Sequence, residues 1–162
     1  MSRQGPFADL GLARRIESTD AWVGVESARF HAQLHPESGT TWMTVPGGFA
    51  IFTGVGSTLT QVLGLGTSGP IREEDLDSLE EFFKVRGAGV SIELCPFADR
   101  TVLSLLGTRG YSIAGFSNML VRRLAPPVPT IPSGEFVVVI FISPKFIDII
   151  SRLNTPLFCP NF

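Results

Sequence analysis

Large apolar residues recur with helical spacing in the first part of the chain. Within residues 9–34 they follow one another at intervals of four and seven, as Leu12, Ile16, Val23, Phe30 and Leu34. This spacing places them on one face of a helix. Pro36 ends the helix, because a proline disfavours helical backbone in the residue before it. The pattern predicts one helix over residues 9–34, with Ile16, Val23 and Phe30 buried.

The next segment has the pattern of short strands. Residues 41–45 and 49–53 are rich in β-branched and aromatic residues and flank the turn sequence Pro-Gly-Gly, which predicts a hairpin. A third strand is predicted over residues 59–65. It contains Gly64, and a glycine inside a strand often marks a bulge or a close approach of backbone.

The period then changes to a helical one. Residues 73–86 form a predicted helix that buries Leu76, Leu79 and Phe83, and its acidic first turn suits the helix dipole. Further elements are a strand over 90–94, a helix over 101–108 and strands over 111–114 and 118–124. This order predicts an α/β (α+β) fold with a mixed, mostly antiparallel sheet and helices on both faces.

The end of the chain differs in composition. Residues 125–133 contain four prolines, which predicts a stiff, extended linker. Residues 136–142 are an uncharged apolar run of high β propensity, so an unpaired strand there would favour aggregation. We expect this run to fill a sheet edge, in its own molecule or in a second copy, and so to support a homodimer.

Composition excludes several classes of protein. The chain has 162 residues, a formal net charge of −2 and a hydrophobic fraction of 44%, which indicates a globular domain and no concentrated basic patch for nucleic acid. The longest apolar run is far below the ~20 residues that cross a bilayer. Two cysteines, Cys95 and Cys159, are too few for a disulfide scaffold. We expect a cytoplasmic protein that binds neither nucleic acid nor membrane.

The element order and two segments resemble the GNAT superfamily of N-acetyltransferases. Residues 73–94, EEDLDSLEEFFKVRGAGVSIEL, resemble the family's central helix, its glycine-rich exit and the next strand. Residues 101–124, TVLSLLGTRGYSIAGFSNMLVRRL, resemble its fourth helix, Gly-aromatic turn and final hairpin. The resemblance implies a domain over residues 1–124, the linker of 125–133, and in 134–162 the first strand and remnant of a truncated second unit.

The resemblance implies acetyl-CoA as co-substrate and direct acetyl transfer to a small-molecule or peptide amine. The family binds the CoA pyrophosphate with N–H groups of a Gln/Arg-x-x-Gly-x-Gly/Ala loop before the central helix. The matching residues and the loop after them are Gln61, Gly64, Leu65, Gly66, Thr67, Ser68 and Gly69. A strand bulge followed by an ordinary turn explains the same residues. Pro70 lacks an N–H, and the acidic first turn of the next helix would repel a phosphate, which predicts weak or absent CoA binding.

The family's catalytic groups are not matched in this chain. Its general acid is a tyrosine that lies five residues before the aromatic residue of the Gly-aromatic turn. In this chain that aromatic residue is Tyr111, and the position five residues before it is Leu106, which cannot protonate a thiolate. The asparagine at the start of the fourth helix would fall near Asp99. Glu93 is a possible base and a strand N–H near Gly64 a possible donor to the acetyl carbonyl. The catalytic residues are therefore unknown.

The histidines and Cys95 have side chains that can ligate a metal or act as a nucleophile. His31 and His35 are four apart on the predicted helix and share a face, but a zinc site needs three or four ligands and no further ligand is nearby, so no metal is expected. Cys95 has no adjacent histidine and is expected to be an inert buried thiol. Three readings remain open: an acetyltransferase, a non-catalytic GNAT-like module that binds a partner domain, and a truncated fragment.

Overall fold

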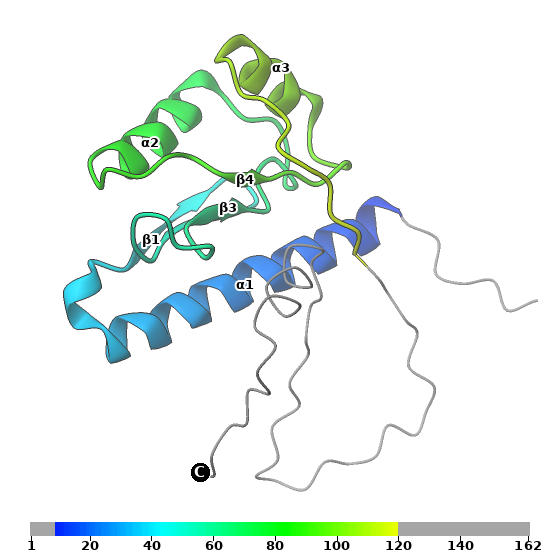
Figure 1. Cartoon of the computed structure of the whole chain (residues 1–162). Coiled ribbons are helices and arrows are strands. Elements are labelled where there is room, and N and C mark those ends of the chain that lie inside the picture. The colour runs from blue at the N-terminus through cyan, green and yellow to red at the C-terminus, as the bar shows by residue number, and fades with distance from the viewer. Residues whose placement is uncertain (1–8, 120–162) are drawn as a thin grey trace, which may run out of the picture. The chain divides into compact units, whose positions relative to one another are not determined.

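The structure of the chain is a computed structural model that describes residues 9–119 (Figure 1). The chain divides into two compact units, and the unit Ala8–Ser112 contains every helix and strand described. In chain order these are α1 (Leu10–Leu34), the short 3-10 helix η1 (Pro36–Ser38), β1 (Thr41–Val45), β2 (Gly48–Phe52), β3 (Gln61–Leu63), α2 (Glu73–Lys84), β4 (Ile92–Glu93) and α3 (Arg100–Thr108). Of the other unit only 113–119 are described, and they form neither helix nor strand. The predictions for the linker 125–133, the strand 136–142, the remnant in 134–162, and Cys159 lie outside the described residues.

The four described strands form one sheet in the order β1-β2-β3-β4. The first three are antiparallel neighbours, and Thr41 lies opposite Phe52 in the hairpin. β4 joins β3 in parallel through two residue pairs, Val62 with Ile92 and Leu63 with Glu93. A parallel connection needs a crossover of a dozen or more residues, and α2 supplies it.

Helices pack on both faces of the sheet (Figure 1). Successive residues of a strand point to opposite faces, so Ala50 belongs to one core and Ile51 to the other. On one face α1 packs with its small residues against Ile51 and Leu63. On the other face lie α2 and α3, whose buried residues are Leu76, Leu79, Phe83, Val102 and Leu106. The predicted α/β fold, with a mixed, mostly antiparallel sheet and helices on both faces, is confirmed.

The starts of α1 and α3 are each capped by an aspartate. Asp9 caps α1 by accepting a hydrogen bond of 2.7 Å from the Leu12 N–H. Asp99 does the same for α3, where the Thr101 N–H donates to its carboxylate at 2.9 Å. These bonds satisfy donors that the first helical turn leaves without a partner. Asp99 is thus an N-cap, at the position where the GNAT resemblance places an asparagine.

The predicted buried face of α1 is wrong. Ala21, Val25 and Ala28 face the sheet, whereas Val23 and Phe30 are exposed and Ile16 is half-buried. The reason is steric, because a Cβ on Gly24 would lie 2.7 Å from the Ile51 Cδ1. The helix therefore approaches the sheet through Gly24, two alanines and Val25, whereas the bulkier Phe30 and Leu34 are exposed.

Several predicted boundaries are also corrected. The third strand is only Gln61–Leu63, instead of residues 59–65, because the chain leaves the sheet at Gly64, which has a φ of 77°. The strand predicted over 90–94 is the two-residue β4. Residues 111–114 form no strand, and neither do the described residues of 118–124. The helix predicted over 73–86 ends at Lys84.

The central position of Leu79 generates a stability prediction. Its side chain is fully buried between α2 and the sheet, so Leu79→Ala should lower the free energy of unfolding by ~2–5 kcal/mol through lost burial and a residual cavity. Leu103→Ala is the matched control, because Leu103 on α3 is 62% exposed. Urea unfolding followed by circular dichroism measures both. A loss below ~1 kcal/mol for Leu79→Ala would contradict the assigned core.

Candidate functional site

The glycines of the predicted CoA motif lie in a turn directly after β3. Gly64 and Gly66 have φ values of 77° and 74°, a region that side-chain-bearing residues rarely adopt. The Gly66 N–H donates to the Pro46 carbonyl at 2.7 Å, and the Thr67 N–H donates to the Gly64 carbonyl at 3.2 Å. These two N–H groups are therefore already used within the protein.

Close packing of two turns explains the same glycines. The β1–β2 turn lies against the turn after β3, so that a Cβ on Gly47 would be 2.4 Å from the Gly64 oxygen. A Cβ on Gly66 would be 2.3 Å from the Val102 Cγ2 of α3. The turn thus lies between the hairpin and α3, and this packing accounts for the glycines without a bound ligand.

The structure separates the seven predicted CoA-binding residues into two groups. Gln61 pairs with Ile51 inside the sheet, and Leu65 is part of the core. Thr67 and Ser68 line a shallow depression of about 260 Å³. Gly69 is the next residue in the chain after Ser68. Among the described residues, none accepts a hydrogen bond from the N–H of Ser68 or Gly69.

The other side of this depression is basic. Arg14, Arg15 and Ser18 line it from α1. The Arg14 Nε donates to the Thr67 carbonyl at 2.8 Å, which ties the first turns of α1 to the loop. No carboxylate is among its lining residues. Two guanidinium groups beside hydroxyl groups form a surface that attracts a phosphate or carboxylate.

Sequence reasoning did not identify Arg14 and Arg15. Nothing in their spacing distinguishes them from ordinary surface charge. Two adjacent arginines at the start of a helix were the available signal. What brings them to this depression is the contact of α1 with Thr67, which lies 53 residues after Arg14 in the chain.

The acidic first turn of α2 lies at a different depression. That surface, about 280 Å³, is lined by Ile71, Arg72, Glu73, Thr101, Ser104 and Leu105. The Asp75 carboxylate accepts a 2.8 Å hydrogen bond from the Arg72 N–H. The acidic residues therefore do not line the depression that carries the two arginines.

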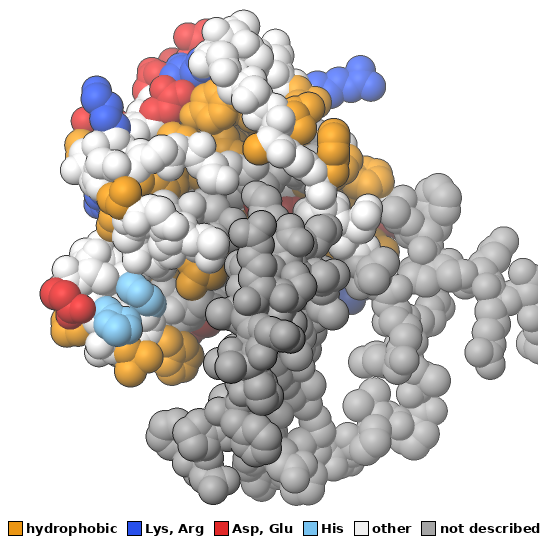
Figure 2. Space-filling view, in the orientation of Figure 1, with side chains coloured by type: hydrophobic (Ala, Val, Ile, Leu, Met, Phe, Trp, Pro, Cys, Tyr) orange, Lys and Arg blue, Asp and Glu red, His pale blue; other side chains and the backbone are white. Residues whose placement is uncertain are grey.

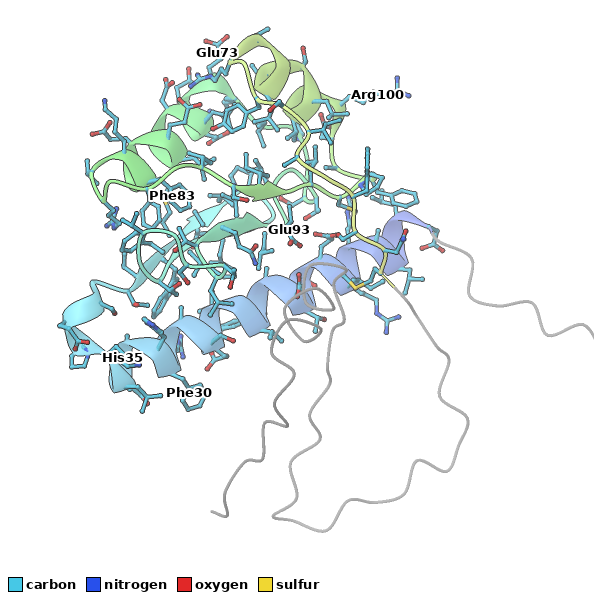
Figure 3. All side chains as sticks on the ribbon, viewed as in Figure 1. Phe30, His35, Glu73, Phe83, Glu93 and Arg100 are labelled. Carbon is cyan, nitrogen blue, oxygen red and sulfur yellow. The ribbon has the colours of Figure 1, made fainter. Side chains whose placement is uncertain are left out.

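A second group of titratable side chains is formed by Glu17, Asp20, Glu93 and Cys95. Burial raises the pKa of Glu17, and the nearby charges of Asp20 and Glu93 add to the effect. Burial also raises the pKa of Asp20 and that of the Cys95 thiol, which hydrogen-bonds to Glu17. Figure 3 shows Glu93 on the side of β4 that faces α1. This group, here called the carboxylate cluster, brings the predicted base Glu93 and the predicted buried thiol Cys95 together with Glu17 and Asp20, which sequence reasoning missed.

Leu106 and Tyr111, near which the resemblance places a general acid, both contribute to the core. Leu106 is buried between α3 and the sheet. Tyr111 packs on the same core and donates a 3.2 Å hydrogen bond to the Glu80 carboxylate. Burial and the charge of Glu80 raise the pKa of Tyr111 to about 12. Arg109 completes the contact, with 3.0 Å between its Nη1 and the Glu80 Oε2. Tyr111 therefore stabilises the end of α3, through the packing of its ring on the core and the hydrogen bond of its hydroxyl to Glu80.

The two histidines lie at the end of α1. Their ring centroids are 5.0 Å apart, and the His31 Nδ1 is 2.7 Å from the Thr40 Oγ1. In the described part of the chain, no three His, Cys, Asp or Glu side chains are arranged to hold a metal ion. Cys95 is a buried free thiol. Among these residues, too, no helix is both long and apolar enough to cross a bilayer.

Comparisons with protein-family models, with curated proteins and with solved structures found no match to this chain. The GNAT resemblance therefore rests on the motifs and element order.

The packing of the motif generates a prediction for Gly66. Gly66→Ala should destabilise the protein by ~1–3 kcal/mol, because it combines a strained positive φ with a clash against Val102. Gly107→Ala is the control: a Cβ at this α3 position meets nothing within 4 Å, and removing a helical glycine should stabilise by ~0.5–1 kcal/mol. Thermal unfolding of the ligand-free protein measures both. Equal stabilities would mean that the motif glycines are not needed for folding.

The carboxylate cluster generates a pH prediction. Because the pKa of Glu17 is raised in the folded protein, the folded state binds this proton more tightly than the unfolded chain. Stability therefore falls as the pH rises from the unfolded pKa, ~4.3, through the folded one. Glu17→Gln keeps an acceptor for Cys95 and should be more stable than the wild type at pH 7, with the difference closing below pH ~4.

Urea unfolding at a series of pH values measures this difference. Glu26→Gln removes a carboxylate on the same helix from a surface ion pair with Arg29 and serves as the control. A wild type that is more stable than Glu17→Gln at pH 7 would show that the ionised carboxylate has a favourable partner in the fold.

Proposed function

We propose that this chain is a GNAT-like module that binds acetyl-CoA, with the pyrophosphate in the depression between α1 and the turn after β3. The observation that carries the proposal is the pair Arg14 and Arg15 facing Thr67 and Ser68 across that depression. Support also comes from the element order, with the loop lying directly before the central helix α2. The ligand is held mainly by side chains of α1, whereas the motif glycines shape the turn.

Phosphate recognition at this place follows from the chemistry of the lining. A guanidinium presents a planar fork of donors that matches two phosphate oxygens. The hydroxyl of Ser68 and the N–H groups of Ser68 and Gly69 add neutral donors, whereas the Ser18 hydroxyl already donates to the Arg15 carbonyl at 3.1 Å. The depression is open to solvent, where a charge pair at ~4 Å contributes about 1 to 4 kcal/mol before desolvation. We therefore expect weak binding, with a dissociation constant of about 0.1–1 mM.

Acetyl transfer to an amine would need a base, and the carboxylate cluster offers one. In direct transfer a carboxylate takes a proton from the ammonium group and the amine nitrogen bonds to the acetyl carbon. The C–S bond then breaks to release the CoA thiolate, and the nitrogen loses its second proton to solvent. A carboxylate whose pKa is raised toward neutrality is a better base for this step, which favours Glu17 over a solvated surface carboxylate. Solvent would have to protonate the thiolate, because Leu106 occupies the position of the family's acid.

Calorimetric titration of the full chain with acetyl-CoA tests the binding site. Arg15→Gln should weaken binding about fivefold by removing one exposed phosphate contact. Arg29→Gln is the matched control on the same helix, since Arg29 pairs with Glu26 and lies over the Trp42 ring, and it should leave the affinity unchanged. No heat with acetyl-CoA at ~5 mM, or an unchanged affinity in Arg15→Gln, would overturn the proposal.

Two further measurements separate the possible functions. Inorganic pyrophosphate that binds as tightly as acetyl-CoA would indicate a plain anion site without CoA recognition and would contradict the GNAT proposal. Release of free CoA thiol in the presence of small-molecule or peptide amines would establish transfer. Acetyl-CoA binding without thiol release would support the alternative, a non-catalytic GNAT-like module that binds a partner domain. A cytoplasmic location belongs to the same proposal.

A further inference from the structure

The side of α1 that points away from the sheet carries an apolar stripe, defined here as Leu12, Ile16, Val23, Phe30 and Leu34. Val23 is two residues from both Ala21 and Val25, or about 200° around the helix, and these two are buried against the sheet. Val23, Phe30 and Leu34 are 45%, 64% and 75% exposed, and Leu12 and Ile16 are half-buried. In Figure 3 the ring of Phe30 points away from the sheet.

The apolar stripe is symmetric about its central residue. Ile16 and Phe30 lie seven residues before and after Val23, and Leu12 and Leu34 lie eleven residues before and after it. In an antiparallel pair of identical helices whose two-fold axis passes at Val23, every apolar residue of one stripe faces an apolar residue of the other. Self-complementarity of this kind is what a two-fold interface requires.

The polar residues within the stripe are compatible with burial in such a pair. Thr19 and Ser27 lie four residues before and after Val23. The Thr19 hydroxyl donates to the Arg15 carbonyl at 2.7 Å, and the Ser27 hydroxyl donates to the Val23 carbonyl at 2.8 Å. Both hydroxyls are satisfied inside their own helix, so covering them does not leave a donor without a partner.

From these observations we propose that the apolar stripe docks on the stripe of a second copy of this chain, antiparallel and with Val23 facing Val23. A partner without this symmetry would not account for the matched offsets. Figure 2 shows hydrophobic side chains gathered beside the histidines at the C-terminal end of α1. The five stripe residues carry no charge. Beside them, Glu26 pairs with Arg29 of its own helix at 3.3 Å, and Asp20, three residues before Val23, belongs to the carboxylate cluster.

The length of the stripe sets the strength of the pair. From Leu12 to Leu34 it runs ~33 Å at 1.5 Å per residue. A helix pair in contact over this length buries on the order of 1,000 Å² in total, at the low end for specific interfaces. We expect a concentration-dependent dimer with a dissociation constant of about 10 µM or weaker.

Sedimentation velocity of the full chain over a range of concentrations tests the dimer, and a charge swap tests its register. Val23→Glu and Val23→Lys each place two like charges face to face at the axis and should each give a monomer. An equimolar mixture of the two variants should again form a dimer, because the opposite charges then face each other. Circular dichroism should show both variants folded, since Val23 is exposed and Glu and Lys are good helix formers.

Leu103→Glu is the control, because it charges an exposed apolar residue on another helix and should leave the dimer intact. A wild-type chain that stays monomeric up to ~1 mM would overturn the proposal. So would a dimer that survives both Val23 variants, as expected if the copies associate through residues 136–142. A mixture of the two variants that remains monomeric would overturn the antiparallel register.

Discussion

The close approach of α1 to the sheet at Gly24 determines most of what this structure can do. Ile51 and Leu63 lie where a Cβ on Gly24 would be, so the helix packs through a face of small residues and cannot rotate to another. This contact fixes both the height and the rotation of a helix of 25 residues. Burial of Ala21, Val25 and Ala28 then follows, and so does the exposure of the larger apolar residues on the opposite side.

The same contact positions the chemistry. With the helix held at Gly24, its first turns lie beside the loop after β3, where the Arg14 Nε reaches the Thr67 carbonyl. Glu17 lies within hydrogen-bonding reach of Cys95 and near the charge of Glu93. One helix thus contributes the arginines of the candidate phosphate depression and two residues of the carboxylate cluster. Both groups combine residues 14–20 with residues far along the chain. Neither group could therefore be recognised from the sequence before the long-range packing was known.

The parts that the sequence predicted correctly are those governed by local patterns. The hairpin follows from alternating strand residues around Pro46-Gly47-Gly48, and α2 from the spacing of Leu76, Leu79 and Phe83. In α2 only one face carries large apolar residues, so the spacing of these residues predicts a single buried face. In α1 two faces are apolar, one small and one large, and periodicity favoured the large one. Close packing determines that the face with Gly24 contacts the sheet, and a hydrophobic pattern alone does not predict this choice. The turn after β3 was predicted as a binding site from its motif, which stays a prediction, and the arginines opposite it were not predicted, because their position depends on a contact between distant segments.

The motif glycines show why a matching pattern is weak support for a ligand. The β1–β2 turn and α3 pack so closely against the loop that Gly64 and Gly66 leave no room for a side chain. The Gly66 N–H already donates a hydrogen bond to the Pro46 carbonyl. A backbone cradle made of these groups has little left to offer a pyrophosphate. Binding energy must then come from side chains on α1, which are solvated in the absence of ligand and contribute less than fixed backbone donors in a closed site. If the chain binds acetyl-CoA in this way, its affinity should depend strongly on salt. The apolar stripe lies on the same helix but on the side away from the sheet, so substitutions at Val23 should test the proposed association without altering the depression.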